Sequence, residues 1–259
     1  MKSWDLTGKT ALVCGASEGM GRASAEMMAE RGAKIIALSR TEKNLQQMVQ
    51  ELAGTGHQYF AVDLSDMSAV KEKLLPFLQK QDIHILINNA GGPKGGPLHE
   101  AKVEEFLAPI QAHIFAAHVI TQAVLPSMRK AHYGRIVNII STSVKVPIPN
   151  LGVSNTVRGA MANWSKTMAG ELAPFGITVN NLLPGFIKTG RFDAIVQTSS
   201  KSQNISEEQA AEQMRNYIPM KRIGDPKEVA EVISFLVSPA ASYITGTNIT
   251  VDGGRTQTL

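Results

Sequence analysis

The stretch from Thr10 to Gly21, TALVCGASEGMG, constrains the fold more than any other part of the chain. It starts as an apolar run, continues as a glycine-rich turn, and is followed by a helical pattern of apolar residues. This order predicts a strand over Thr10–Cys14 and a helix over Gly21–Arg31 that Gly32 ends. A strand, a tight turn and a helix packed back on the strand form the basic unit of a layered α/β fold.

The three glycines of this turn predict a phosphate-binding loop. Gly15 can make the sharp turn, Gly19 can let a phosphate approach the backbone, and Gly21 can let the helix pack against the strand. The turn also leaves backbone N–H groups at the positive end of a helix, which suits a pyrophosphate. The spacing G-x-x-x-G-x-G differs from the best-known dinucleotide fingerprint, so an ordinary glycine-rich loop is the alternative interpretation.

Strand and helix patterns alternate along the rest of the chain. Further apolar strands are expected at Lys34–Leu38, Gln58–Val62, Ile83–Ile87, Arg135–Ile140, Ile177–Leu183 and Asn248–Val251. The helices expected between and after them are Glu42–Leu52, Met67–Gln79, Lys102–Lys130, Ser154–Ala173 and Pro226–Val237. Continuously apolar strands separated by helices predict an α/β fold: a doubly wound parallel sheet of about seven strands with helices on both faces.

Ligands of such folds bind at the carboxyl ends of the strands. Besides the glycine loop, four segments are expected at those ends: Asp63, Asn88–Gly92, Ser141–Ser143 and Pro184–Gly185. Five loops that meet at one edge of a sheet are stronger evidence for a ligand site than any single motif. Residues 188–217 are polar and are expected to form a mobile lid or short helices outside the core. No linker or repeat divides the chain, so residues 1–259 are expected to form one domain.

Composition excludes several functional classes. The net charge of +4 is small. The basic pI of about 9.1 is a weak indication of nucleic-acid binding, because an anionic cofactor explains it equally well, and no nucleic-acid partner is expected. The single cysteine, Cys14, is interpreted as a core residue and fits a reducing compartment. The N-terminus lacks the apolar core of a signal peptide, and no apolar run approaches about 20 residues. We therefore expect a cytoplasmic protein without a membrane partner or a metal site.

Five motifs together carry a resemblance to a known family. They are CGASEGMG at 14–21, VDLSD at 62–66, NNAGG at 88–92, RIVNIIS at 135–141 and LPGFIKT at 183–189. With the tail at 222–254, they make the chain resemble the short-chain dehydrogenase/reductase family, most of all its 3-oxoacyl-acyl-carrier-protein reductase branch. The resemblance covers essentially the whole chain. It implies a Rossmann-type sheet, NAD(P) binding and a homotetramer or homodimer.

The resemblance also assigns cofactor contacts residue by residue. The glycine loop would hold the pyrophosphate, Asp63 and Leu64 the adenine, and the loop from Pro184 to Thr189 the nicotinamide side. The complete expected set is Gly15, Ser17, Glu18, Gly19, Met20, Gly21, Ser39, Arg40, Asp63, Leu64, Asn89, Ala90, Gly91, Arg158, Pro184, Gly185, Ile187 and Thr189. For Asn89, a role as a turn residue at a strand end is an alternative that can hold at the same time.

The end of the second strand indicates which dinucleotide binds. Family members that prefer NAD place an acidic residue there, to accept hydrogen bonds from the ribose hydroxyls. Here the position is Ser39, followed by Arg40. No carboxylate would repel a 2′-phosphate, and a guanidinium is available to pair with one. NADP(H) is therefore favoured over NAD(H), with a merely solvated Arg40 as the alternative.

The catalytic positions depart from the family pattern. Ser141 matches the family's serine, but Ser154 stands at the tyrosine position, Arg158 at the lysine position and His113 at the asparagine position. A serine hydroxyl has a far higher pKa than a phenol and cannot readily act as the same acid or base. Arg158 keeps a positive charge and can still bind ribose hydroxyls. Water, His113 or Tyr217 could supply the proton, and a satisfied histidine on a helix face is the alternative for His113.

Two functions from different classes remain open. The first is an NADP(H)-dependent carbonyl reductase or alcohol dehydrogenase with an atypical active site, acting on a small molecule, with 3-oxoacyl thioesters as one candidate substrate. The second is a catalytically silent NADP(H)-binding sensor or scaffold. The intact cofactor motifs favour the first, and the replaced tyrosine and lysine favour the second.

Overall fold

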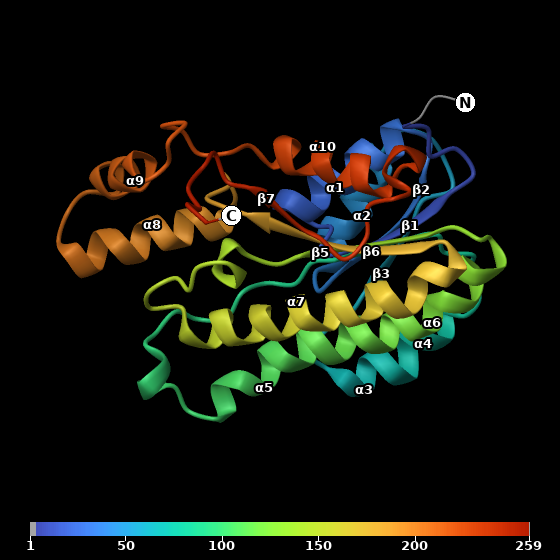
Figure 1. Cartoon of the computed structure of the whole chain (residues 1–259), viewed down its shortest axis with the longest axis horizontal. Coiled ribbons are helices and arrows are strands. Elements are labelled where there is room, and N and C mark those ends of the chain that lie inside the picture. Colours follow the sequence, from blue (N-terminus) through green and yellow to red (C-terminus); the bar gives the residue numbers. More distant parts are fainter. Residues whose placement is uncertain (1–3, 259) are drawn as a thin grey trace.

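The computed structural model describes residues 4–258, and its centre is a parallel sheet in the strand order β3-β2-β1-β4-β5-β6-β7 (Figure 1). The strands are β1 Thr10–Cys14, β2 Lys34–Ser39, β3 Gln58–Ala61, β4 Ile85–Asn88, β5 Gly134–Ile139, β6 Ile177–Pro184 and β7 Asn248–Val251. All six neighbouring pairs are parallel. The doubly wound sheet predicted from the apolar runs is therefore confirmed.

Helices cover both faces of the sheet (Figure 1). On one face lie α1 Gly19–Glu30, α2 Glu42–Glu51 and α10 Pro226–Val237. On the other lie α4 Leu75–Leu78, α6 Ala116–Lys130 and α7 Gly152–Leu172. Each layer encloses its own apolar cluster against the sheet, so the central strands are buried from both sides. Cys14 belongs to the second cluster and is fully buried, which confirms its role as a core residue.

The sheet has its switch point between β1 and β4. The chain runs from β1 outward to β2 and β3, and then returns to place β4 on the other side of β1. The loops that follow β1 and β4 therefore turn toward opposite faces of the sheet. The crevice between such loops is where ligands of open α/β sheets bind.

Two of the predicted helices contain a π-helical turn. The segment predicted as Met67–Gln79 consists of α3 Met67–Ala69, a π turn η1 at Val70–Leu74, and α4, which has a proline in its first turn. The long predicted helix divides in the same way into α5 Glu104–Ile110, a π turn η3 at Gln111–Phe115, and α6. In both segments the proline removes one backbone donor, so the regular ladder of hydrogen bonds changes nearby.

By length and composition the segment Glu104–Lys130 could span a membrane. Its α6 part instead packs on the sheet through fully or nearly fully buried residues, among them Ile120, Val124 and Met128. An apolar helix of this kind is the core helix of a soluble protein.

A ladder of asparagines crosses four strands at the same level. Asn88, Asn138, Asn181 and Asn248 are register partners on β4, β5, β6 and β7. Their side-chain amides form a chain of hydrogen bonds of 2.8, 3.1 and 2.8 Å, and Asn138 also donates to Ser165 at 2.8 Å. Because buried amides are costly unless they are paired, this ladder fixes the register of the strands below the ligand edge.

Residues 188–217 form two helices, α8 Gly190–Gln203 and α9 Glu207–Asn216, beside the carboxyl ends of the strands (Figure 1). The expectation of short helices is confirmed. The expectation that the segment lies outside any core needs correction, because Phe192, Val196, Ala210 and Met214 form a small buried cluster between the two helices. The polar composition of the segment hid this cluster, since only one face of each helix is apolar.

Candidate active site

The glycine loop has the geometry that its three glycines predicted. Gly15 and Gly19 have positive φ angles of 61° and 56°, in the left-handed region that favours glycine. A Cβ on Gly21 would lie 2.1 Å from the carbonyl oxygen of Gly15, so no side chain fits there. The loop therefore depends on glycine for its shape at two positions and for close packing at the third.

The first turn of α1 faces the loop without a side-chain cap. Glu18 occupies the N-cap with extended backbone, and its side chain makes no capping hydrogen bond within the described residues. The N–H groups of the first turn are thus left for another acceptor. An uncapped helix N-terminus behind a glycine loop fits a phosphate group.

Asn89 joins the loop after β4 to the loop after β1. Its side-chain amide donates to the carbonyl oxygen of Gly15 at 3.3 Å. A Cβ on Gly15 or on Gly21 would lie 2.6 or 2.8 Å from this same amide nitrogen. Asn89 therefore has a structural role at the end of β4, because it holds the two loops of the switch point together.

The end of β2 offers hydroxyl and guanidinium groups. The hydroxyl of Ser39 is buried without a hydrogen-bond partner within the described residues, and Arg40 beside it is exposed. Asp63 accepts hydrogen bonds from the backbone and hydroxyl of Ser65 at 2.8 and 2.7 Å. Partial burial acts to raise the pKa of Asp63, but these bonds and the charge of Arg40 outweigh it and hold the pKa below its usual range. Arg40 is thus an exposed cation near the carboxylate of Asp63.

The loop after β6 forms the opposite wall. Thr189 is the N-cap of α8, and a Cβ on Gly19 would lie 3.1 Å from its methyl group. Ile187 is buried, and Gly185 lies so close to Asp252 that a Cβ would approach its side chain to 2.6 Å. The segment therefore packs against Asp252 on one side, and its Thr189 lies beside Gly19 of the glycine loop on the other.

Ser141, Ser154 and Arg158 come from two elements beside β4. Ser141 follows β5, and its oxygen accepts from the N–H of Ser143 at 3.0 Å, which leaves its proton free to be donated. Ser154 and Arg158 are four residues apart on α7, so they lie one turn apart on one face of the helix. Arg158 is buried and donates to the carbonyl oxygens of Ile139 at 3.0 Å and Ala90 at 3.4 Å. The end of β5 and this face of α7 therefore adjoin through Arg158, and we call the surface that they form the wall of the site.

Arg158 remains a cation at neutral pH. Burial, together with the positive charge of Arg191, lowers the pKa of Arg158 to about 10. That value still lies well above neutrality, so the guanidinium holds its proton while it is surrounded by backbone carbonyls. It supplies a fixed positive charge and no titrating acid.

His113 is buried and neutral. It lies in the π turn η3, and its Nε2–H donates to the carbonyl oxygen of Gly91 at 3.0 Å. Burial and the charge of Arg158 lower its pKa to about 3, against a smaller opposite effect of the Gly91 hydrogen bond. This geometry favours the interpretation of His113 as a satisfied histidine, because an imidazole that is already neutral and bonded is a poor proton donor.

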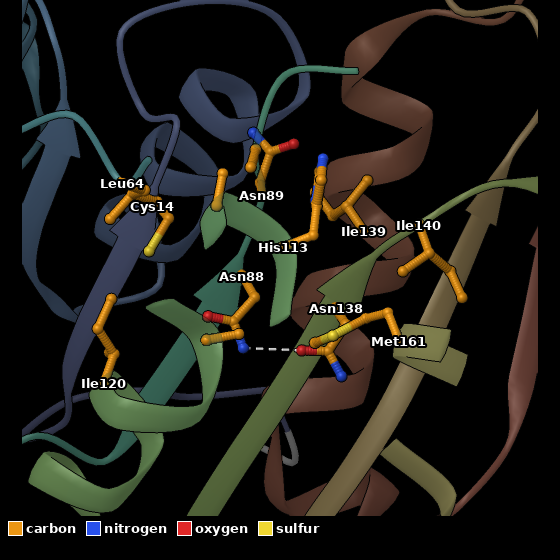
Figure 2. A pocket seen from close by; sticks show the side chains of 13 residues that line it. Cys14, Leu64, Asn88, Asn89, His113, Ile120, Asn138, Ile139, Ile140 and Met161 are labelled. Atoms are coloured by element: carbon orange, nitrogen blue, oxygen red, sulfur yellow. Dashed lines mark hydrogen bonds between the residues drawn. The ribbon is translucent and has the colours of Figure 1, made fainter. Parts of the chain in front are cut away.

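A cavity of about 10 Å³ lies behind these residues. Figure 2 shows its polar side, with Asn89 and His113 above the hydrogen-bonded pair Asn88 and Asn138. This volume holds about one water molecule and no substrate. The cavity is therefore no substrate site, and the side of the wall on which Arg158 approaches exposed Arg191 of α8 is the open side.

The sequence pattern missed one residue of this open side. Arg191, in the first turn of α8, donates to the carbonyl oxygen of Pro93 at 2.9 Å and lies beside Gly92. Nothing in the polar pattern of residues 188–217 distinguished it from other exposed cations. Tyr217, considered as a proton donor, caps the far end of α9 and is 75% exposed. Within the described residues, no cluster of His, Cys, Asp or Glu could hold a metal ion.

Comparison with known proteins agrees with this geometry. The family model described as "Enoyl-(Acyl carrier protein) reductase" matches residues 15–256. The chain is 34% identical to the 3-oxoacyl-[acyl-carrier-protein] reductase FabG of Vibrio cholerae serotype O1, over 96% of this chain and 98% of the relative. It is 31% identical to the NADPH-dependent reductase BacG of Bacillus subtilis, over 98% of this chain and 100% of the relative.

A solved structure with the same architecture is that of L-sorbose reductase from Gluconobacter frateurii, in complex with NADPH and L-sorbose. The two structures superpose with a TM-score of 0.93 at 28% identity, over 99% of this chain and 100% of the other. The family model and the relatives cover nearly the whole chain. The chain belongs to the short-chain dehydrogenase/reductase family of oxidoreductases.

Proposed function

We propose that this protein is an NADP(H)-dependent reductase or dehydrogenase that interconverts a carbonyl group and an alcohol on a small molecule. The observation that carries the choice of cofactor is the end of β2, where Ser39 stands in place of an acidic residue and exposed Arg40 offers a guanidinium to a 2′-phosphate. The relatives named as NADPH-dependent or bound to NADPH support the same choice.

The residues present fit such a dinucleotide. The uncapped start of α1 would hold the pyrophosphate, Arg40 the 2′-phosphate, and the loop from Pro184 to Thr189 the nicotinamide side. The glycine cradle has no room for additional side chains, which suits close contact between backbone and phosphate. When bound, the cofactor supplies or accepts a hydride. The side chains of the protein bind and orient the substrate and stabilise the charge on its oxygen.

In the proposed reduction, Ser141 donates its free proton as a hydrogen bond to the substrate oxygen. Ser154, on the same face of α7 as Arg158, is the second hydroxyl available to that oxygen. Arg158 provides the fixed positive charge that stabilises negative charge as it develops there. Because neither serine can act as an acid near neutral pH, the proton is finally delivered by water at the open side of the wall.

A catalytically silent cofactor-binding protein is the second candidate. The observation that favours it is the pair Ser154 and Arg158, which stands at the positions of the family's tyrosine and lysine. The two candidates differ in turnover alone, since both require that NADP(H) binds.

The proposal also includes the domain organisation, the location and the oligomeric state. We infer one domain in which residues 188–217 act as the substrate lid, a cytoplasmic location, and a homodimer or homotetramer. Val103 at the N-cap of α5, Leu107 in α5 and Phe115 in η3 support self-association, because they are 75%, 57% and 51% exposed to solvent.

Turnover tests the proposal. Purified protein is incubated with NADPH and a panel of aldehydes, ketones, oxo acids and a 3-oxoacyl thioester, and NADPH oxidation is followed by absorbance. We expect oxidation with part of the panel, and Ser141→Ala is expected to slow it about 100-fold by removing a donor to the substrate oxygen. NADPH binding without oxidation by any compound would support the silent protein instead.

A further inference from the structure

Two arginines from different elements meet at one backbone position. A Cβ on Gly92 would lie 3.7 Å from Nη2 of Arg191 and 3.9 Å from Nη2 of Arg158. Arg158 belongs to the long core helix α7, whereas Arg191 belongs to the first turn of α8. Both guanidinium groups therefore border the same space beside the loop that follows β4.

Neither arginine has an anionic partner within residues 4–258. Arg158 donates to the carbonyls of Ile139 and Ala90, and Arg191 donates to the carbonyl of Pro93. The ion pairs of the described residues all involve other side chains. Two like charges held close together without a counter-charge repel one another, and the lowered pKa of Arg158 reflects this in part. An anion placed between them would relieve the repulsion.

The two arginines lie next to the proposed catalytic serines, on the open side of the wall. Arg158 is one turn from Ser154 and next to the wall that carries Ser141. Arg191 is exposed and lies on the lid side of Gly92, where the chain is open. Because Arg158 is one turn from Ser154, the space that the two guanidinium groups border adjoins the proposed reacting position.

We propose that the substrate carries a carboxylate, and that Arg158 and Arg191 bind this carboxylate beside Gly92. The substrate class is then an oxo acid or hydroxy acid whose carboxylate lies a few bonds from the reacting carbon. Planar guanidinium groups suit this ligand, because their parallel N–H groups match the two oxygens of a carboxylate. The assignment of the anion as a substrate group rests on the proposed reductase function.

Binding tests the anion site independently of turnover. Acetate, butanoate and benzoate, each with its uncharged amide, are titrated by calorimetry into the protein saturated with NADP⁺. We expect each carboxylate to bind wild-type protein about tenfold or more tightly than its amide. Equal binding of acids and amides by the wild-type protein would overturn the proposal without the use of any variant.

Variants locate the site. Arg191→Gln is expected to remove the preference for carboxylates, and Arg191→Lys to restore part of it, since the charge returns without the planar fork. Lys201→Gln, which removes the same charge from the far end of α8, is the matched control and should keep the preference. The NADP⁺ dissociation constant is measured for each variant. If Arg191→Gln weakens NADP⁺ binding but leaves the carboxylate preference, the arginine serves the cofactor phosphates and the proposal is wrong.

Turnover then separates this proposal from the one on which it rests. Oxo acids from pyruvate to phenylpyruvate are compared with their methyl esters as substrates for NADPH oxidation. We expect higher kcat/KM for the acids, through KM, and loss of this difference in Arg191→Gln. Carboxylate binding without reduction of any oxo acid supports the anion site but contradicts the reductase function. Reduction of acids and esters at equal kcat/KM supports the reductase function and overturns the anion site.

Discussion

The side chain of Asn89 donates a hydrogen bond to the carbonyl oxygen of Gly15, and this contact joins the two loops at the centre of the sheet. Gly21 packs against the same pair, because a Cβ there would lie 2.1 Å from that oxygen and 2.8 Å from the amide nitrogen of Asn89. The loop that is proposed to hold pyrophosphate is thus built on one crowded point between β1, α1 and β4.

This crowding predicts that Gly21→Ala is strongly destabilising. The added methyl group meets backbone, which cannot rotate away as a side chain would, so the free energy of unfolding should fall by about 3 kcal/mol. Gly170→Ala on α7 is the control: a Cβ there meets nothing within 4 Å, and alanine favours a helix by about 0.5–1 kcal/mol over glycine. Urea unfolding of both variants measures the difference, and equal stability of the two would contradict the packing described.

The end of β2 predicts a switch of cofactor preference. Ser39→Asp with Arg40→Leu places a carboxylate near the ribose and removes the guanidinium that would pair with a 2′-phosphate. The ratio of NADP⁺ to NAD⁺ affinity should fall about 100-fold or more, as expected when a charge-assisted pair is replaced by repulsion. The two dissociation constants are measured by calorimetry, with Lys43→Leu on α2 as a control for lost charge. An unchanged ratio would place the 2′-phosphate elsewhere.

The asparagine ladder predicts a stability cost in the core. Asn138→Leu removes the partner of Asn88 and of Asn181 at once and leaves buried amide groups unpaired. We expect the free energy of unfolding to fall by about 2–4 kcal/mol, since each unsatisfied buried group costs about 1–3 kcal/mol. Exposed Asn163→Ala on α7 should change stability by less than about 0.5 kcal/mol. A small effect of Asn138→Leu would mean that the ladder contributes register without stability.

His113 predicts how stability depends on pH. The folded chain keeps this imidazole neutral down to about pH 3, mainly because it is buried, while the unfolded chain protonates it near pH 6.5. The unfolded state then binds more protons between these values, so stability falls as pH decreases through that window. Between about pH 7.5 and pH 5, His113→Asn should lose about 2 kcal/mol less stability than the wild type.

Urea unfolding at the two pH values measures this difference, and His99→Asn, at an exposed histidine, is the control. Because folded His113 does not titrate above about pH 6, the pH dependence of turnover in that range should be the same in the wild type and in His113→Asn. A pH-dependent step in the wild-type rate that His113→Asn removes would identify His113 as a titrating catalytic group and contradict its interpretation as a satisfied histidine.

The sheet and its loops could be predicted because their signals are local. Apolar runs gave β1 and β7 with the bounds that the structure has, and Asp225, Pro226 and Glu228 mark the start of α10 as a capped helix. Motif positions then placed the glycine loop, the Asn89 loop and the Thr189 loop at one edge, because parallel strands bring their carboxyl ends together.

The rest could not be predicted because it depends on contacts between distant parts of the chain. Arg191 matters through its position beside Gly92, and its own helix shows only an exposed cation in a polar segment. The neutrality of His113 arises from burial in a π turn, which the helical pattern of residues 102–130 does not reveal. The ladder was visible only as separate asparagines, since its order depends on strand register.

The proposed function depends on hydride transfer, and an isotope label on the cofactor follows the hydride into the product. NADPH carrying deuterium on the transferable position of its nicotinamide is incubated with the protein and the panel of oxo acids and other carbonyl compounds, and the products are analysed by mass spectrometry. We expect an alcohol with one deuterium on the former carbonyl carbon, formed by the wild type and far more slowly by Ser141→Ala. Tight NADPH binding with no deuterated product from any compound would contradict the proposed function and identify a silent member of the family.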